Sequence, residues 1–303
     1  MDEIRAHLPE EPNTFIGRER ELVELRQLLH RTRALTLSGP GGIGKTRLAL
    51  RLLASAAAEF PDGVWFVELA DLRQPELVVS RVAAVIGITE EAGRPLLETL
   101  GDALRPRRML LALDNCEHLL DACAEVARHL LASAPGLRLV NTSREPLSVA
   151  AETIWRVPPL SVAPAGADPA AAAPGAERYE AVRLFGDRAA ASKPGFTVGP
   201  DNVAAITAIC RALDGMPLAI ELAAARVRAL SVEQIVARLD DRFGLLTAGD
   251  RSAAPRQRTL RAAIEWSYEL LTDPERAPER GPDPREGVQQ DHSPLEGFHA
   301  AEE

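Results

Sequence analysis

The chain has 303 residues, of which 46% are hydrophobic, and a formal net charge of −9 at pH 7. This length and composition allow about two domains with a sizeable core. The charge is uneven, because residues 273–303 carry nine acids and three arginines while the remainder is nearly neutral at −3. No basic stripe is present, so direct binding to nucleic acid is disfavoured.

The cysteines and the apolar runs indicate where the chain resides. Cys116, Cys123 and Cys210 have no metal-ligand or CxxC spacing, so we expect ordinary core residues in a reducing cytosol. No apolar run is long enough to span a bilayer, and the acidic start lacks the apolar core of a signal peptide. We therefore expect a cytoplasmic protein without membrane contact.

The most informative feature is an ungapped match to the phosphate-binding pattern GxxxxGK[ST]. It comprises Gly39, Pro40, Gly41, Gly42, Ile43, Gly44, Lys45 and Thr46. A short β-prone run, 34–38, precedes it, and a run with helical spacing begins at Arg47. Strand, glycine-rich loop and helix are the context in which backbone N–H groups converge on phosphate oxygens. The sequence therefore predicts ATP or GTP binding, with Arg47 beside the loop.

Two side chains of this loop have predicted chemical roles. Lys45 supplies a mobile positive charge to the β and γ phosphates, and it is one of only two lysines in the chain. The Thr46 hydroxyl is a ligand for the Mg²⁺ that accompanies the nucleotide. We expect Lys45 to take part in catalysis as well as in binding.

Strands and helices alternate across residues 1–160. Strands are expected at 63–69, 109–114, 137–141 and 154–157, and helices at 18–30, with Gly17 at its N-cap, and at 76–86, 96–104 and 117–134. Such alternation is typical of an α/β fold with a doubly wound parallel sheet that binds ligands at the carboxyl ends of its strands. We therefore expect a P-loop NTPase domain over 1–160.

The composition changes after this domain. Residues 161–177 are almost all Ala, Pro and Gly, which predicts a linker. Residues 178–250 follow helical patterns, with helices expected at 178–191, 201–213, 217–229 and 231–241, and a further helix at 259–271. The tail, 273–303, has few large apolar side chains and is expected to be disordered.

Acidic residues after the third strand are candidates for metal binding and catalysis. Asp114 closes a strand that should lie beside the phosphate-loop strand, where its carboxylate would reach Mg²⁺. Asn115 cannot act as a base, whereas Glu117 either activates the attacking water or begins the next helix. His118 is more simply a helix residue than a metal ligand.

Two further positions have alternative interpretations. Arg144 follows the strand at 137–141, so its guanidinium either contacts a γ-phosphate or forms an ion pair with Glu145 or another acid. Gly215 and Pro217 are typical of a helix end followed by a proline at the next helix start.

Five ordered motifs resemble one family. They are FIGRERELVELRQLL at 15–29, GPGGIGKT at 39–46, LLALDNCEHLL at 110–120, NTSREPL at 141–147 and DGMPLAIELAAAR at 214–226. In order and spacing they are similar to STAND-type signalling ATPases of the NB-ARC kind. The resemblance is greatest to the ATPase module of actinobacterial LuxR-type and antibiotic-regulatory transcriptional activators, relatives of AP-ATPases, and covers about residues 13–272.

This resemblance implies a nucleotide switch with ATP or ADP and Mg²⁺ as cofactors. Phe15, Ile16, Gly17 and Arg18 would border the adenine, and Pro217 of an ARC-like helical domain would close over the base. In such proteins ADP holds a closed form, and exchange for ATP opens the module for self-association or for release of a protein partner. Slow hydrolysis would reset the switch.

The chain also departs from the family. The expected winged-helix domain starts within 251–272, but after Arg276 the sequence changes character, and neither a DNA-binding domain nor sensor repeats are present. We interpret this as a truncated or frame-altered reading of a longer regulator. One alternative is a non-hydrolysing interaction protein or remnant. A less favoured alternative is a P-loop kinase for a small metabolite, for which no acceptor motif is found.

Overall fold

The computed structural model describes residues 6–150, 152–164 and 175–246. The chain divides into two compact units, 1–264 and 265–303, and the second lies wholly outside these ranges. Three predictions fall outside the described residues: the helix at 259–271, the winged-helix start at 251–272 and the tail at 273–303. Most of the linker also falls outside them. Every described helix and strand belongs to the first unit.

A parallel sheet of six strands in the order β1-β3-β4-β5-β2-β6 organises the first part of the chain. Its strands are β1 Ala6–His7, β2 Ala34–Ser38, β3 Val64–Glu68, β4 Leu110–Asp114, β5 Arg138–Ser143 and β6 Glu152–Arg156. All neighbouring strands run parallel. The predicted α/β P-loop fold is therefore confirmed, and only the two-residue β1 was not expected.

One prediction about strand order is wrong. We expected the strand that ends at Asp114 to lie beside the phosphate-loop strand, but β5 separates β4 from β2. Asn141 of β5 is the link, since it is in register with Leu113 on one side and Thr36 on the other. Parallel strands that are buried on both faces lack polar alternation, so their sequence pattern does not reveal which of them are neighbours.

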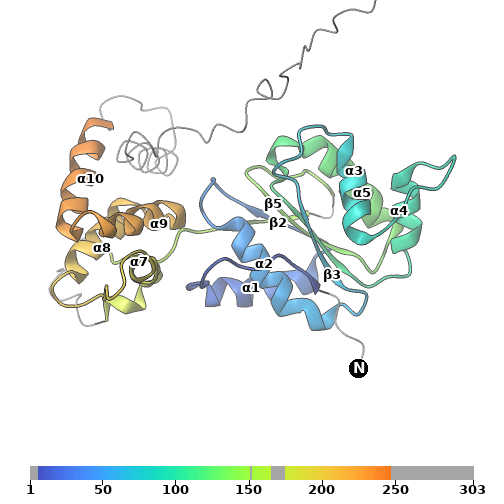
Figure 1. Cartoon of the computed structure of the whole chain (residues 1–303). Coiled ribbons are helices and arrows are strands. Elements are labelled where there is room, and N and C mark those ends of the chain that lie inside the picture. The colour runs from blue at the N-terminus through green and yellow to red at the C-terminus, as the bar shows by residue number, and fades with distance from the viewer. Residues whose placement is uncertain (1–5, 151, 165–174, 247–303) are drawn as a thin grey trace, which may run out of the picture. The chain divides into compact units, whose positions relative to one another are not determined.

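Helices cover both faces of the sheet (Figure 1). Trp65, Val67, Leu111 and Leu113 belong to a core with α3 Leu77–Ile86, α4 Leu96–Leu104 and α5 Leu120–Ser133. The alternate strand residues, Val64, Phe66, Leu110 and Ala112, are also buried, on the side where α1 Glu19–Arg31 and α2 Lys45–Ala56 pack. Burial on both faces explains why these strands lack polar alternation.

Two helix starts differ from the predictions. Arg18, with φ 69°, precedes α1 as its N-cap, so the predicted N-cap at Gly17 is wrong by one residue. The predicted helix at 117–134 begins only at Leu120, because Asn115 is left-handed at φ 65° and a 3-10 turn, Cys116–His118, intervenes. The alternative in which Glu117 begins the helix is therefore wrong.

The four helices expected after the linker are present. They are α7 Glu180–Ser192, α8 Val203–Ala212, α9 Pro217–Ala225 and α10 Val232–Leu246, with 3-10 turns at Ala176–Arg178 and Arg226–Arg228. Pro217 begins α9 as expected, and Gly215 lies in the turn after α8, with φ 65° and its N–H bonded to Cys210 O at 3.1 Å. A Cβ at Gly215 would lie 2.2 Å from Leu160 O, so this close approach requires glycine.

Within the described ranges, no helix combines the length and apolarity needed to cross a bilayer.

Candidate functional site

The phosphate loop presents a helix start to its pocket. Helix α2 begins at Lys45 after Gly44, and no side chain caps its first turn. The first N–H groups of an uncapped helix lack intrahelical acceptors and, with the helix dipole, attract an anion. The local geometry therefore fits the predicted phosphate site.

Lys45 is buried, with 8% of its surface exposed, and its ammonium faces the loop. Its Nζ donates to Gly39 O at 2.9 Å and to Pro40 O at 3.3 Å. Burial lowers the pKa of Lys45, and the nearby carboxylates of Glu117 and Asp114 oppose this while Arg144 adds to it. The four predicted catalytic side chains, Lys45, Asp114, Glu117 and Arg144, are thus close enough for their charges to interact.

Asp114 reaches the phosphate loop across β5 and not from an adjacent strand. Its carboxylate is 4% exposed, accepts a hydrogen bond from Thr142 Oγ1 at 2.5 Å, and is also bonded by the Thr46 hydroxyl. Burial raises the pKa of Asp114, and the bonds from Thr142 and Thr46 partly offset this increase. A carboxylate next to a hydroxyl is a set of hard oxygen donors suited to Mg²⁺.

Thr142 is a site residue to which the sequence motifs assigned no role. Besides donating to Asp114, its hydroxyl accepts the Asn115 N–H at 2.9 Å. Thr142 therefore orients the buried carboxylate and the turn after it. Its position near the carboxyl end of β5, two residues before Arg144, was the available signal.

Glu117 and Arg144 contact each other. Arg144 Nε donates to Glu117 Oε1 at 2.9 Å, with the Arg144 side chain 63% exposed and that of Glu117 15% exposed. Glu117, and not Glu145, is therefore the acid in the ion pair that was one alternative for Arg144. The other oxygen, Glu117 Oε2, is buried and finds no hydrogen-bond partner within the described part of the chain.

His118 is held by structural contacts. Its Nε2 lies 2.8 Å from Leu72 O, and its Nδ1 lies 3.5 Å from the Asn115 amide. Among the described residues, no group of three or more His, Cys, Asp or Glu side chains could hold a metal ion on its own. Metal binding here would depend on Thr46, Asp114 and oxygens of the ligand.

Residues 13–18, before α1, form a second part of the site, which we call the mouth. Arg18 is 4% exposed, and its guanidinium donates to Ile43 O of the phosphate loop at 3.2 Å. Its backbone N–H donates to Glu180 Oε1 at 2.6 Å. Gly17 has φ 75°, and a Cβ there would lie 2.5 Å from the same carboxylate oxygen, so Glu180 fits only against glycine.

The helices after the linker also contact the site. The Leu218 N–H donates to Gly42 O of the phosphate loop at 3.2 Å. Glu180 of α7 accepts the Ser161 N–H at 3.0 Å, and its own N–H donates to Ser161 Oγ at 3.0 Å. Burial would raise the pKa of Glu180, but the hydrogen bonds from Arg18 and Ser161 outweigh it and the pKa lies below its ordinary value.

These parts enclose a pocket of about 310 Å³. Of the predicted residues, the pocket is lined by Phe15, Ile16, Arg18, Gly41, Gly42, Ile43, Gly44, Lys45, Thr46, Arg47, Glu117, Arg144 and Pro217. Gly17, Gly39, Pro40 and Asp114 do not line the pocket. Residues without a predicted role that also line it are Asn115, Thr142, Leu160, Leu184, Leu218 and Glu221. The volume and mixed lining suit a small polar ligand such as a nucleotide.

Comparison with known proteins agrees with this geometry. Residues 27–147 match the family model of an AAA domain. The chain is 47% identical, over 251 residues or 83% of its length, to a protein of Mycobacterium tuberculosis named as an HTH-type transcriptional regulator. Residues 27–147 are therefore similar to an AAA-type P-loop domain.

The relatives that this chain matches are longer proteins. The chain spans 26% of the length of the HTH-type regulator. It is also 41% identical over 273 residues to an uncharacterized protein of M. tuberculosis, covering 90% of this chain and 65% of that protein.

A solved structure supports the fold. A Walker-type ATPase of Pyrococcus abyssi superposes with a TM-score of 0.50 at 13% identity, covering 89% of this chain and 94% of that chain.

Proposed function

We propose that this chain is the ATP- and ADP-binding switch module of a transcriptional regulator, of the STAND or NB-ARC kind. The observation that carries the proposal is that the phosphate loop and the post-linker helices share one pocket, with Leu218 bonded directly to Gly42 O. A ligand in this pocket would touch both parts of the chain. Its binding energy would therefore depend on their arrangement.

The phosphate end supports binding of the nucleotide with Mg²⁺. Lys45 would exchange its bonds to Gly39 O and Pro40 O for bonds to phosphate oxygens, so the cation needs little movement. Thr46 and Asp114 would hold Mg²⁺, which neutralises charge on the phosphates when bound. The remaining predicted residues, Phe15 to Arg18 and Pro217, would surround the base.

A switch requires that two nucleotides favour different arrangements of the same chain. Arg144 is the residue best placed to distinguish them, because it lines the pocket, is 63% exposed and is tied only through Glu117 in the described structure. A γ-phosphate would compete with Glu117 for this guanidinium, whereas ADP would leave the ion pair intact. In the activated form we propose self-association or contact with a protein partner, and no direct nucleic-acid binding by this chain.

Slow Mg²⁺-dependent hydrolysis would reset the switch. Once Arg144 is released to a γ-phosphate, the Glu117 carboxylate could accept a proton from water. A second candidate is a non-hydrolysing nucleotide-binding module, and the Glu117–Arg144 ion pair at 2.9 Å favours it because the candidate base is already engaged. Measurement of single-turnover phosphate release from bound ATP distinguishes the two.

Identification of the co-purifying nucleotide tests the proposal. The purified protein is denatured and the released nucleotide identified by chromatography, and the emptied protein is then titrated with ATP and ADP with Mg²⁺. We expect ADP in stoichiometric amounts and rebinding of both nucleotides. A protein that carries no nucleotide and binds neither one would rule the proposal out.

A further inference from the structure

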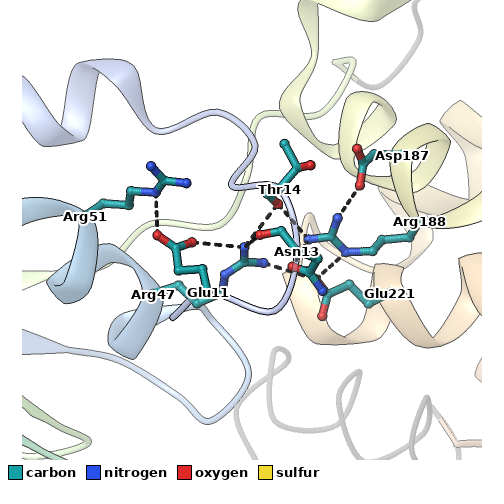
Figure 2. Close-up of polar contacts among 8 residues, drawn as sticks. All are labelled: Glu11, Asn13, Thr14, Arg47, Arg51, Asp187, Arg188 and Glu221. Carbon is teal, nitrogen blue, oxygen red and sulfur yellow. Dashed lines mark hydrogen bonds and ion pairs between the residues drawn. The ribbon is translucent and has the colours of Figure 1, made fainter. Parts of the chain in front are cut away.

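Residues 11–15, a short segment near the start of the chain, are contacted by two arginines of α2 and by Arg188 of α7 (Figure 2). On the side of α2, Arg51 Nε lies 2.6 Å from Glu11 Oε1, and the Arg47 guanidinium donates to Glu11 Oε2 at 3.3 Å. Arg47 also donates to Asn13 O at 2.9 Å and Thr14 O at 3.1 Å. The helix that begins at the phosphate loop thus holds this segment by backbone and side-chain contacts.

On the other side, Arg188 of α7 holds the same segment. Its guanidinium donates to Asn13 Oδ1 at 2.8 Å and to Thr14 O at 2.9 Å. It also donates to Glu221 Oε1 of α9 at 3.0 Å and to Asp187. Only 8% of Arg188 is exposed. Arg188 does not line the pocket. A buried arginine with this many acceptors is an ordered contact rather than a solvated side chain.

The two sides converge on two acceptors. Thr14 O accepts hydrogen bonds from both Arg47 and Arg188. Glu221 Oε1 lies 3.0 Å from Arg188 Nε and 3.6 Å from an Arg47 nitrogen. Each positive side chain in this network faces a carboxylate: the arginines are Arg47, Arg51 and Arg188, and the acids are Glu11, Asp187 and Glu221. The three positive and three negative charges balance, so the network needs no bound ligand to neutralise it.

The network continues directly into the pocket. Phe15, the residue after Thr14, lines the pocket, and its ring centroid lies 5.7 Å from Arg47 Cζ and 5.1 Å from Arg51 Cζ. Arg47 and Glu221 are also pocket residues. Arg188 therefore contacts Thr14, the chain neighbour of Phe15, and the pocket residue Glu221, without lining the pocket itself.

We propose that Arg188 is a positioning residue for the nucleotide pocket: through Asn13, Thr14 and Glu221 it holds Phe15 at the mouth and makes nucleotide affinity depend on α7. This inference rests on the proposed nucleotide binding, but the hold on residues 11–15 is independent of it. Two measurements separate the claims.

The hold is tested by amide hydrogen exchange without nucleotide. In Arg188→Ala we expect faster exchange in peptides covering residues 8–18 than in wild type, with β2 and β4 unchanged. Arg183→Ala is the matched control, because Arg183 is on the same helix but pairs with Glu19 at the exposed surface, at 3.5 Å. Equal exchange at residues 8–18 in wild type and Arg188→Ala would overturn the proposal.

The effect on the pocket is tested by the Kd for ADP and ATP of the folded variants. Arg188→Ala should raise Kd by about 30-fold, equivalent to about 2 kcal/mol at 1.4 kcal/mol per tenfold. Arg188→Lys should recover part of the loss, since an ammonium retains the charge but not the planar fork. Arg183→Ala should stay within about twofold of wild type.

A milder variant guards against misfolding of Arg188→Ala. Asn13 is exposed, so Asn13→Ala removes one acceptor of Arg188 without disturbing the core, and it should raise Kd by about three- to tenfold. If wild type binds nucleotide and these variants bind equally well, the positioning role is wrong. If wild type does not bind, the proposed function is wrong, and the hydrogen-exchange result alone decides whether Arg188 holds residues 11–15.

Discussion

The phosphate end and the mouth of the pocket are built differently. The phosphate end comes from one contiguous loop and two nearby strand ends, with Lys45 and Asp114 buried beside it. The mouth joins residues 13–18 to α7 through bonds such as Arg18 to Glu180 and Arg188 to Thr14, which span 162 and 174 positions. Local backbone geometry forms the phosphate loop itself, whereas the contacts of the mouth with α7 exist only when the post-linker helices are docked. We therefore expect the phosphate end to supply affinity and the mouth to supply its dependence on conformation.

The largest effect is expected at the phosphate end. Lys45→Ala removes the cation that would meet the β and γ phosphates, so nucleotide affinity should fall by about 100-fold or more, about 3 kcal/mol. Isothermal titration with ADP and ATP measures it. Lys193→Ala, at an exposed site and the chain's other lysine, is the matched control and should bind as wild type. Normal binding by Lys45→Ala would mean that the mouth, and not the loop, provides the affinity.

Asp114→Asn separates the metal contribution from the rest of the phosphate end. Affinity in the presence of Mg²⁺ should fall by about tenfold, while affinity in EDTA stays unchanged. Because burial raises the pKa of Asp114, the Mg²⁺-dependent part of wild-type affinity should be lost at a higher pH than an ordinary aspartate predicts, as the pH falls through that raised pKa.

Asp114→Asn should lower nucleotide affinity but raise the stability of the ligand-free protein. A raised carboxyl pKa means that folding disfavours the ionised form, so the ligand-free variant should have a higher free energy of unfolding than wild type at pH 7. Urea unfolding measures this, and the exposed Asp121→Asn serves as control. A destabilised Asp114→Asn would show that ionised Asp114 is compensated by more than its hydrogen bonds to Thr142 and Thr46.

Thr142→Val tests how much the two hydrogen bonds of the Thr142 hydroxyl contribute at the phosphate end. It removes the donor to Asp114 Oδ1 and the acceptor of the Asn115 N–H, so the free energy of unfolding should fall by about 1–3 kcal/mol. Since the Thr142 bond lowers the pKa of Asp114, its loss should move the pH dependence of Mg²⁺-dependent binding to higher pH. Thr153→Val, on edge strand β6, should leave that profile in place.

The smallest of these effects is expected for a substitution of Glu180, at the mouth. Glu180→Gln weakens the bonds to Arg18 and Ser161, and the free energy of unfolding should fall by roughly 1 kcal/mol at pH 7, since the site is partly exposed. The pKa of Glu180 is lowered, so its contribution is present above the ordinary glutamate pKa and is lost as the pH falls through the lower folded value. Unfolding of wild type and variant across acidic pH measures this.

A control at the exposed residue Glu177 completes that comparison. Glu177→Gln should show no such pH-dependent difference from wild type. If Glu180→Gln also showed none, the bonds between the mouth and α7 would contribute nothing to stability, and the contrast between the two ends of the pocket would disappear.

Much of the fold and of the phosphate site could be predicted. The strands at β2 to β6, the helices after the linker and the loop at 39–46 all have strong local signals in apolar periodicity or in a fixed motif. Strand order could not be predicted, because parallel strands buried on both faces resemble one another, and so Asp114 was expected beside β2. The late start of α5 was missed because Asn115 adopts a left-handed conformation that composition does not reveal.

The sequence by itself determined that this chain has a P-loop, which residues form it, and that helices follow an α/β sheet. These features arise from backbone geometry and periodicity within a few residues of one another. Only the tertiary structure decided that Thr142 orients Asp114, that Glu117 pairs with Arg144, and that Arg188 grips Thr14. Such contacts join residues whose separation along the chain carries no signal of their proximity, so their partners emerge only when sheet and helices pack.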